Sequence, residues 1–325
     1  MMRYAMAAAK PGGSDVIRKI ELGAMSPSAE EVLIRHEAIG LNFLDIYIRN
    51  GAYPWPVDAD LVLGSEGAGV IEAVGSNVKG LAAGDRVGYT LANGAYASHR
   101  LIDAGYVVKL PDNVSSELAA SIMLKGLTVA YLIHDSFKVE AGHTVLFHAA
   151  AGGVGLIAGQ WLNALGAKVI GTAGGADKCA LAEANGYRHV IDYKSADFEA
   201  EVMKLTDGKG VDVTYDSVGN DTMARSLAST RRHGTIIAFG QSSGPYLDFK
   251  ITDLAKGSYK LSRPTLFHFV GERGWLETNA SKLFAAVTDG TLNISINQQY
   301  PLEDVAKAHD ALTGRATTGS TILTI

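Results

Sequence analysis

The chain carries a glycine-rich turn whose spacing suits the binding of phosphate groups. The β-like run Thr144–Ala149 leads into the letters AAGGVG at positions 150–155, and a helical pattern follows. Gly152 and Gly153 would let the backbone approach a pyrophosphate, and Gly155 would let the helix pack against the strand. The N–H groups at the start of the helix would bind the phosphates. Because the turn keeps the second and third glycines of the fingerprint G-x-G-x-x-G, with alanine at the first position, we predict a dinucleotide site.

The end of the next β-like run indicates which dinucleotide would bind. NAD sites place a carboxylate there, which hydrogen-bonds the ribose 2′-hydroxyl and repels a 2′-phosphate. Here residues 171–178 read GTAGGADK, with no acid at the strand end and Lys178 within the first helical turn. A 2′-phosphate would meet this cation, whereas Asp177 is expected to cap the helix and face away. We therefore predict NADPH as the cofactor, and Thr172 in this run is one of its candidate binding residues.

These two segments belong to a regular alternation of β-like and helical patterns that begins near Thr144. Such alternation predicts a parallel, doubly wound α/β sheet of the Rossmann type. After the first strand and its helix Gly153–Leu165, the series runs Lys168–Ala173, Asp177–Ala184, His189–Tyr193, Phe198–Leu205, Val211–Ser217, Thr222–Ser229 and Thr235–Phe239.

Both flanks of this series are less regular. Before Lys125, short β-like runs separated by turn residues predict a mostly antiparallel domain: Val32–Glu37, Gly67–Val74, Asp85–Tyr89, Ala95–Leu101 and Val107–Leu110. The last part of the chain has helical patterns at Trp275–Gly290 and Leu302–Leu312 and β-like ones at Ile294–Tyr300 and Ser320–Ile325. We expect the two flanks to join into one domain into which the parallel sheet is inserted.

The composition is that of a soluble globular protein. The 325 residues are 47% hydrophobic and 19% charged, and 29 basic against 34 acidic residues give a net charge of −5, which does not call for a polyanionic partner. A single cysteine, Cys179, excludes an internal disulfide and fits a reducing compartment, so we expect a cytoplasmic protein. The uncharged stretch 141–167 is better explained as strand, turn and helix than as a membrane span.

Several motifs in order along the chain carry a family resemblance. They are AIGLNFLD at 38–45, GSEGAGV at 64–70, AGDRV at 83–87, LKGLT at 124–128, AAAGGVG at 149–155, YDSVG at 215–219 and RATTGS at 315–320. Together they resemble the quinone oxidoreductase branch of the medium-chain dehydrogenase/reductases, and particularly the bacterial NADPH:quinone oxidoreductases related to zeta-crystallin. The resemblance covers essentially the whole chain.

This resemblance implies a GroES-like catalytic domain from residues 1–124 and 263–325, a Rossmann domain from residues 125–262, a cofactor cleft between them and a homodimer. Lys178, Tyr193 and Gly174 would hold the 2′-phosphate, and Gly153 and Val154 would lie at the pyrophosphate. The adenosine and nicotinamide would be lined by Ser217, Val218, Phe239, Gly240, Ser242 and Ser243. The cleft side would be bordered by Asn42, Asp45, Tyr47, Thr128, Tyr131, Pro264, Leu266 and Arg315.

The motifs differ from those of the zinc alcohol dehydrogenases at the metal ligands. That branch has a cysteine where Asn42 stands and a histidine where Ser65 stands, and it carries a cysteine-rich structural zinc lobe that this chain lacks. We therefore predict no metal. A quinone is already a good electron acceptor, so weak hydrogen-bond donors can replace a Lewis acid. The candidate donors are Asn42, Tyr47 and Tyr53, although both tyrosines also suit a half-buried packing role, as His148 and Lys125 suit structural ones.

Two other functions remain open at this stage. A zinc-free NADPH-dependent enone or enoyl reductase would use the same geometry, because a polarised C=C bond also accepts hydride. A weakly catalytic NADPH-binding protein with an RNA-binding or structural role is the alternative from another class. The basic cluster of Arg225 and residues 231–233, which we place on the fourth helix of the βα series, is better explained as a solvated face than as a nucleic-acid site.

Overall fold

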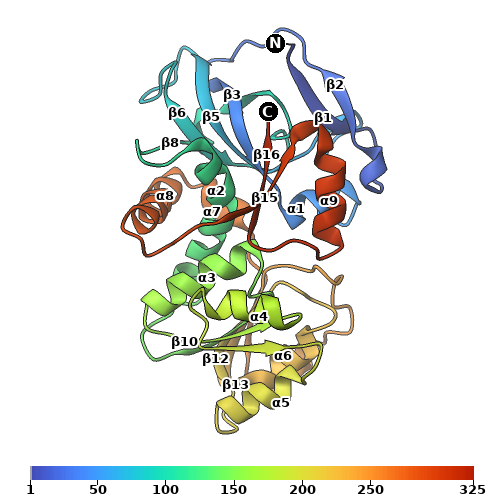
Figure 1. Cartoon of the computed structure of the whole chain (residues 1–325), viewed down its shortest axis with the longest axis vertical. Helices are drawn as coiled ribbons and strands as arrows, with labels where there is room; N and C mark the ends of the chain where they lie inside the picture. Colours follow the sequence, from blue (N-terminus) through green and yellow to red (C-terminus); the bar gives the residue numbers. More distant parts are fainter. Residues whose placement is uncertain (1) are drawn as a thin grey trace. The chain divides into compact units, whose positions relative to one another are not determined.

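The computed structural model describes residues 2–325, and the chain divides into two compact units. The flank unit comprises Met1–Leu127, Phe267–Thr288 and Ile294–Ile325, and the central unit comprises Thr128–Leu266 and Asp289–Asn293. Figure 1 shows the chain coloured by sequence. The domain limits expected at residues 125 and 262 stay a prediction.

The flank unit contains a seven-stranded sheet that draws on both ends of the chain. Its strand order is β15 (Ile296–Pro301), β16 (Ser320–Thr324), β3 (Glu31–Gly40), β5 (Glu66–Val74), β6 (Arg86–Thr90) and β8 (Val107–Lys109), and β7 (His99–Asp103) also pairs with β3. All pairs are antiparallel except β15 with β16. Because β16 pairs with β3, the prediction that the two flanks join into one domain is confirmed.

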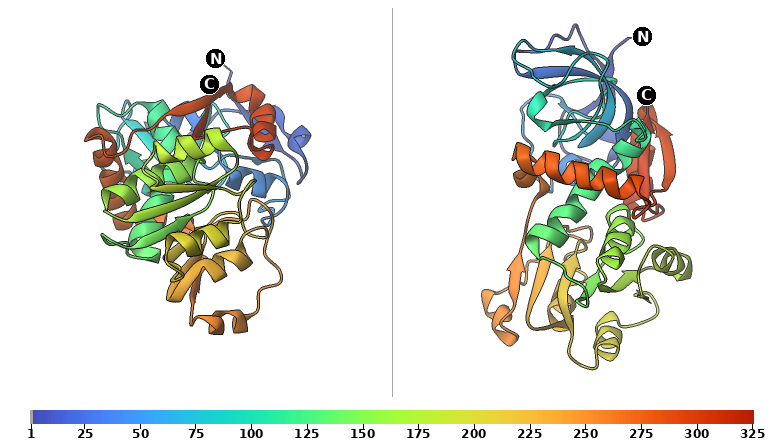
Figure 2. Two further views of the ribbon diagram at one scale, coloured as in Figure 1. Left: turned by 60° about the horizontal axis from the view of Figure 1, so that its bottom comes forward. Right: turned by 90° about the vertical axis from the view of Figure 1, so that its left-hand side faces the viewer.

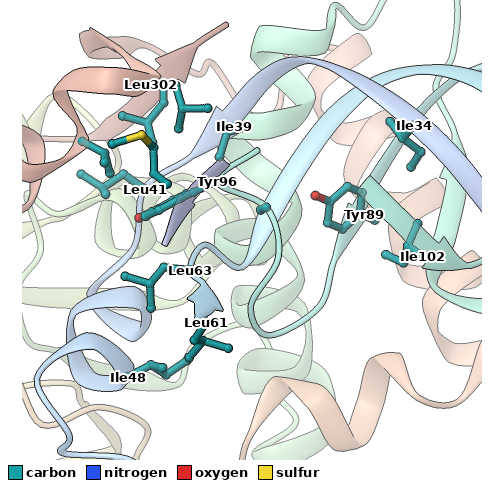
Figure 3. Close-up of a cluster of buried hydrophobic side chains, with 14 of the residues drawn as sticks. Ile34, Ile39, Leu41, Ile48, Leu61, Leu63, Tyr89, Tyr96, Ile102 and Leu302 are labelled. Carbon is teal, nitrogen blue, oxygen red and sulfur yellow. The ribbon is translucent and has the colours of Figure 1, made fainter. Parts of the chain in front are cut away.

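A second, three-stranded sheet in the flank unit has the order β2 (Arg18–Glu21), β1 (Tyr4–Ala8) and β4 (Leu61–Val62). The hydrophobic core of this unit includes Ile34 and Ile39 of β3, Leu63 after β4, and Tyr89 and Tyr96, whose side chains are fully buried. Figure 3 shows the two tyrosine rings among the aliphatic side chains of this core. Both hydroxyl groups must therefore find partners inside the protein.

The helices of the flank unit are α1 (Phe43–Arg49), α9 (Val305–Thr313), α8 (Arg273–Thr288) and most of α2 (Ser116–Tyr131), with a short α7 (Leu266–Val270) at the boundary. Helix α9 packs against α1. Single turns of 3-10 helix occur in this unit at Ser14–Val16, Ala104–Tyr106 and Leu302–Asp304. In the central unit, Ile251–Lys256 is a six-residue 3-10 helix, and a π-helical turn, Leu132–Ser136, follows α2. The segment Ser116–Ser136 is long and apolar enough to cross a membrane, yet 89% of its apolar window is buried, as in a core helix.

The central unit is a six-stranded, all-parallel sheet, as predicted. Its order is β11 (His189–Asp192), β10 (Lys168–Ala173), β9 (Thr144–Phe147), β12 (Val211–Asp216), β13 (Thr230–Ala238) and β14 (Lys260–Ser262). Helices α3 (Gly153–Ala164) and α4 (Ala176–Glu183) contact each other, as do α5 (Phe198–Leu205) and α6 (Met223–Ser229). The two pairs cover opposite faces of the sheet (Figure 2). The strand order reverses between β9 and β12, where α/β folds bind ligands.

Three local predictions were wrong. Residues 231–233 lie in β13 and not on a helix, because the strand begins at Thr230. The β-like run Ala95–Leu101 contributes only its last three residues to β7, because the chain turns at Ala95, whose carbonyl accepts the Ala97 N–H. The helical pattern from Leu302 gives α9 only from Val305, after one 3-10 turn.

Candidate active site and cofactor site

The turn between β9 and α3 has the shape required by the glycine fingerprint. Gly152 is the N-cap of α3, so no side-chain group caps the first helical turn. A Cβ atom on Gly155 would lie 2.6 Å from the Ala150 carbonyl oxygen and closer still to that of Ala149. Gly155 therefore allows the helix to approach the strand, which is the role predicted for it. The uncapped N–H groups of this turn, which includes Gly153 and Val154, suit a pyrophosphate.

Alanine at the first fingerprint position is explained by the backbone conformation of the turn. Ala150 is fully buried and its N–H donates to the Thr172 carbonyl oxygen at 3.0 Å. The left-handed residue is its neighbour Ala149, with φ of 55°. Ala150 therefore needs no glycine, whereas Ala149 carries the backbone strain.

The end of β10 brings three predicted cofactor residues into one region. A Cβ atom on Gly174 would lie 2.5 Å from the Tyr193 hydroxyl oxygen, so the tyrosine side chain covers this glycine. Tyr193 is exposed at 42% of its surface, and Lys178 is half-buried in the first turn of α4. The expectation that Asp177 caps α4 was wrong, since the N-cap is Gly175 and has no side chain to cap with.

A carboxylate that the sequence reasoning missed lies beside this turn. Asp192, the last residue of β11, accepts the backbone N–H groups of Gly175 at 2.9 Å and Lys194 at 3.0 Å. These two donors hold its pKa below the usual value. The signal was present in the sequence, because Asp192 stands one residue before the end of the third β-like run, His189–Tyr193. Its charge orients the glycine turn.

Thr172 has its side chain inside the central unit. Its hydroxyl lies 2.8 Å from His148 Nδ1, and both residues are buried. His148 Nε2 lies 2.9 Å from the Ser226 hydroxyl, which donates to Asp216 Oδ2 at 2.7 Å. Burial lowers the pKa of His148, with the nearby Asp216 charge opposing the effect. His148 is therefore a satisfied structural histidine, as predicted.

The Asp216 carboxylate fixes the loop that follows β12. Its Oδ1 accepts the N–H groups of Val218 at 2.8 Å and Gly219 at 3.0 Å. The loop after β13 is joined to this one by two backbone bonds, from Ser242 N–H to the Ser217 carbonyl at 3.1 Å and from Ser243 N–H to the Val218 carbonyl at 2.9 Å.

The loops after β12 and β13 thus form one unit at the carboxyl ends of two neighbouring strands. Gly240 passes so close to Ser217 that a Cβ atom would lie 2.7 Å from its carbonyl oxygen, and Phe239 packs on Phe147 with ring centroids 5.7 Å apart. All six residues predicted to line the adenosine and nicotinamide belong to these two loops.

In the flank unit, Asn42 is held between two buried carboxylates. Its side-chain Nδ2 donates to Glu66 Oε1 at 2.8 Å, and its backbone N–H donates to Asp45 Oδ2 at 2.9 Å. Glu66 Oε1 also accepts from Lys125 Nζ at 2.7 Å in a buried ion pair. Lys125 therefore has the structural role considered for it.

Asp45 has no exposed surface, and burial raises its pKa to about 6. Besides Asn42, Ser65 Oγ donates to it at 2.6 Å and Tyr96 Oη at 2.9 Å. Because these donors occupy both carboxylate oxygens, the Asp45 side chain offers a ligand nothing to contact.

The two candidate tyrosines lie together on and after α1. The rings of Tyr47 and Tyr53 meet edge to face with centroids 5.6 Å apart, and Phe43 lies 6.1 Å from Tyr47. Both tyrosines are half-buried, which suits a packing role for their rings.

The remaining predicted cofactor residues are distributed over both units. In the central unit, Thr128 and Tyr131 are buried on α2, Pro264 is half-buried after β14, and Leu266 is buried. In the flank unit, Arg315 is exposed with φ of 57°.

Two arginines of the basic cluster considered as a nucleic-acid surface are paired with acidic residues. Arg225 lies 3.6 Å from Asp197 and stacks over the Phe198 ring, and Arg231 Nε donates to Asp212 at 2.6 Å. Within residues 2–325, no group of three or more His, Cys, Asp or Glu side chains has the arrangement of a metal site.

Two family models match the two parts of this architecture. The "Alcohol dehydrogenase GroES-like domain" matches residues 28–112, and the "Zinc-binding dehydrogenase" model matches residues 153–272. Together with the inserted parallel sheet, these matches define a medium-chain dehydrogenase/reductase.

Individual relatives narrow this class. A quinone oxidoreductase of Pseudomonas aeruginosa is 43% identical over 314 residues, 96% of each chain. The crystal structure of Escherichia coli quinone oxidoreductase complexed with NADPH has a TM-score of 0.97 and 42% identity, covering 99% of this chain and all of that one. A 2-haloacrylate reductase of Burkholderia is 40% identical over 97% of this chain and 96% of its own. The chain belongs to the quinone oxidoreductase family of the medium-chain dehydrogenase/reductases, which confirms the resemblance seen in its motifs.

Proposed function

We propose that this protein is an NADPH-dependent, zinc-free quinone oxidoreductase. The relatives named as quinone oxidoreductases support the substrate class, and the NADPH complex of the E. coli relative supports the cofactor. The observation that carries the proposal in this chain is the turn after β10, where Gly174 lies under Tyr193 and Lys178 follows in α4 without an acid at the strand end. This set of residues fits a ribose 2′-phosphate.

When bound, NADPH supplies a hydride to an acceptor. The residues of the chain supply binding and orientation. The uncapped start of α3 binds the pyrophosphate, and the loops held by Asp216 line the adenosine and nicotinamide. Asn42, Tyr47 and Tyr53 donate hydrogen bonds to the acceptor oxygen, which stabilise the negative charge that develops there.

A titration combined with turnover tests the proposal. NADPH and NADH are titrated by fluorescence, and each is then oxidised with 1,4-benzoquinone and 9,10-phenanthrenequinone. We expect NADPH-selective binding and quinone turnover. Lys178→Ala should weaken NADPH binding by about 10- to 100-fold, the value of one charge-assisted hydrogen bond, and leave NADH binding unchanged.

Lys204→Ala is the matched control, because Lys204 is an exposed lysine of the same unit on α5. Its NADPH affinity should equal that of the wild type. Equal loss of NADPH and NADH binding in Lys178→Ala would contradict the phosphate role. Tight NADPH binding without quinone turnover would contradict the reaction.

Reduction of activated C=C bonds is the second candidate, favoured by the 40% identity to a 2-haloacrylate reductase. Adding 2-chloroacrylate and an enone to the same assay separates the two. A kcat/KM for quinones above that for both alkenes supports the proposal, and the reverse order moves the function to alkenes.

We also propose a cytoplasmic homodimer. Strand β14 is an edge of the parallel sheet, and the segment before it exposes two large apolar side chains, Leu247 at 83% and Ile251 at 74%. Two large apolar side chains exposed next to a sheet edge suit a contact between copies. Light scattering after size exclusion should give twice the chain mass, and the double change Leu247→Ser with Ile251→Ser should shift the protein toward monomer. A wild-type monomer at micromolar concentration would contradict this.

A further inference from the structure

A buried chain of hydrogen bonds in the flank unit has a defined direction. Arg49 Nη1 lies 3.1 Å from His309 Nδ1, and His309 Nε2 lies 2.9 Å from Tyr96 Oη. An arginine only donates, so His309 Nδ1 accepts. Burial, aided by the Arg49 charge, lowers the pKa of His309 to about 3, so the ring is neutral and carries its proton on Nε2. Tyr96 therefore accepts from His309 and must give its own proton to another acceptor.

That acceptor is Asp45. Tyr96 Oη donates to Asp45 Oδ2 at 2.9 Å, so the chain runs from the cation Arg49 through two neutral groups to a carboxylate. Asp45 receives only donors, since Ser65 and the Asn42 N–H are its other partners. A carboxyl group that accepts three hydrogen bonds, and has no neighbour to accept a proton from it, has all its hydrogen bonds satisfied as the anion. This holds for Asp45 although its side chain is fully buried.

The anion in turn fixes Asn42. Asn42 is the N-cap of α1, with extended φ and ψ of −140° and 154°, and its N–H bond to Asp45 holds this conformation. Its side-chain amide is oriented separately by the bond from Nδ2 to Glu66. With the backbone N–H tied to Asp45 and Nδ2 tied to Glu66, the amide has one direction, and the second N–H of Nδ2 is the one that can donate to an acceptor oxygen.

Glu66 is placed by the sheet register. It pairs with Gly40 at the end of the β3–β5 ladder. Gly40 precedes Asn42 by two residues in the chain. Gly40 has no room for a Cβ atom, which would collide with Glu66 Oε1 and with the Ala120 carbonyl oxygen. Glu66 Oε2 accepts the Leu124 N–H at 2.7 Å. Glu66, which holds the side chain of Asn42, is therefore itself held rigidly. The backbone of Asn42 is held by Asp45 and the hydrogen bonds that Asp45 accepts.

We propose that Asp45 is a positioning residue for the reaction and that the chain Arg49–His309–Tyr96–Asp45 sets the direction of the Asn42 amide toward the acceptor oxygen. The inference rests on the proposed function and concerns only residues of the flank unit. Its chemical reason is that a misplacement of about 1 Å in a donor lowers the rate by up to about a hundredfold, while substrate binding changes little.

The test compares two tyrosine hydroxyls. Tyr96→Phe deletes the link between His309 and Asp45. Tyr89→Phe is the matched control, because Tyr89 is also fully buried in the flank unit and its Oη lies 2.7 Å from His36 Nε2. The His36 bonds end at the Ala97 carbonyl oxygen, 2.6 Å from Nδ1, and do not lead to Asn42.

We expect Tyr96→Phe to lower kcat with quinones by at least about tenfold, with the NADPH Kd and the quinone KM within about twofold of wild type. Tyr89→Phe should also lose thermal stability, because it leaves the buried His36 without its hydroxyl partner, yet keep the wild-type kcat. Equal kcat in the two variants would overturn the inference.

Asp45 variants add a readout that a purely structural role would not change. In Asp45→Asn, the amide oxygen can still accept from Tyr96 and Asn42, and Ser65 can reverse its hydroxyl to accept from the amide nitrogen. This variant should therefore keep more of the wild-type kcat than Asp45→Ala does.

The pH dependence of kcat provides the second readout. In the wild type, kcat should fall as the pH decreases through about 6, since Asp45 takes up a proton there and then loses one of its three donors. The charged groups around it are Glu66 on β5, Arg49 on its own helix and Lys125 on α2 beyond Glu66, with neutral Tyr96 and His309 on the other side. Asp45→Asn should lack this acid limb. An unchanged limb would overturn the role of Asp45.

Failure of the inference and failure of the function are distinguishable. Wild-type turnover with full activity in Tyr96→Phe removes only the inference. Wild-type protein that oxidises NADPH with neither quinones nor activated alkenes removes both. The direction of the chain is checked without activity, by the nitrogen NMR shifts of labelled histidine, where His309 should be protonated at Nε2. Protonation at Nδ1 instead would overturn the inference.

Discussion

A methyl group on Gly155 would lie 2.6 Å from the carbonyl oxygen of Ala150, so helix α3 approaches the turn after β9 more closely than a side chain at this position would allow. The contact sets where the first turn of α3 begins. Because this turn holds the uncapped N–H groups, the position of the proposed pyrophosphate site depends on one absent side chain.

We expect Gly155→Ala to destabilise the central unit by about 2 kcal/mol, since the obstructing atoms are backbone and cannot rotate away. The melting temperature should fall by about 5 °C, and the NADPH Kd should rise by about tenfold or more because the helix start is displaced. Calorimetry and fluorescence titration measure the two effects.

Gly274→Ala is the control for this change. Gly274 lies in the first turn of α8, and a Cβ atom there meets nothing within 4 Å. Alanine should stabilise the protein by up to about 1 kcal/mol through helix propensity, without any effect on NADPH. A Gly155→Ala protein with wild-type stability and affinity would show that α3 can shift without cost.

The Ser226 hydroxyl joins His148 to Asp216, and a second prediction follows from this bond. Ser226→Ala leaves the His148 Nε2–H without an acceptor and Asp216 Oδ2 without one of its donors. Two disrupted buried partners should cost about 2–3 kcal/mol of unfolding free energy. NADPH affinity should also fall, because Asp216 holds the loop that carries Val218.

Ser229→Ala on the same helix is the control. Ser229 is also fully buried, and within the described chain its hydroxyl has no hydrogen-bond partner. Its loss should be neutral or stabilising, because no bond is broken and a desolvated polar group is removed. Denaturation and NADPH titration of both variants check the pair, and equal destabilisation would show that the His148 bonds carry no special weight.

The sequence predicted the central unit well because its strands are buried on both faces. After its exposed lysine, the run Lys168–Ala173 carries no charge and is followed by two glycines, and the predicted bounds of that strand and of helix Phe198–Leu205 agree with the structure. Where polar residues enter a strand, the pattern fails. Residues 231–233 are charged or polar, and they extend β13 at its exposed beginning, where Arg231 pairs with Asp212.

The flank unit was harder to predict for the opposite reason. Helix α1 has only seven residues, of which Phe43, Ile46, Tyr47 and Ile48 favour strands over helices, so no helical period is visible. The helix forms because Asp45 bonds back to the N-cap Asn42 and because α9, more than 250 residues later, packs against it.

The candidate site divides in the same way. Gly155, Gly174 and Lys178 lie in local motifs, so their spacing in the sequence reveals them. The partners of Asp45 do not lie in a local motif. Tyr96 is 51 residues from Asp45 in the sequence, and His309 is a further 213 residues from Tyr96. A hydrogen-bond chain assembled from such distant segments leaves no spacing to recognise.

The buried histidines make stability depend on pH in a direction that can be calculated. Burial lowers the pKa of His36 and of His309 from 6.5 to about 3, so the unfolded chain binds more protons than the folded one between these limits. Unfolding free energy therefore falls as the pH decreases below 6.5, by about 1.4 kcal/mol per pH unit for each histidine. Asp45 has the opposite effect on stability between pH values of about 6 and 3.8. Its pKa is higher in the folded state, so the folded protein binds the proton first and the contribution of this group to stability rises as the pH decreases.

The two histidines outweigh the single carboxyl, so the net loss between pH 6.5 and pH 5 should be about 2–3 kcal/mol. Urea denaturation at both pH values measures it. His309→Gln should remove about half of the histidine contribution, because the amide does not titrate. Stability that is equal at the two pH values in the wild type, or a slope that His309→Gln does not reduce, would mean that these histidines gain a proton without unfolding the protein.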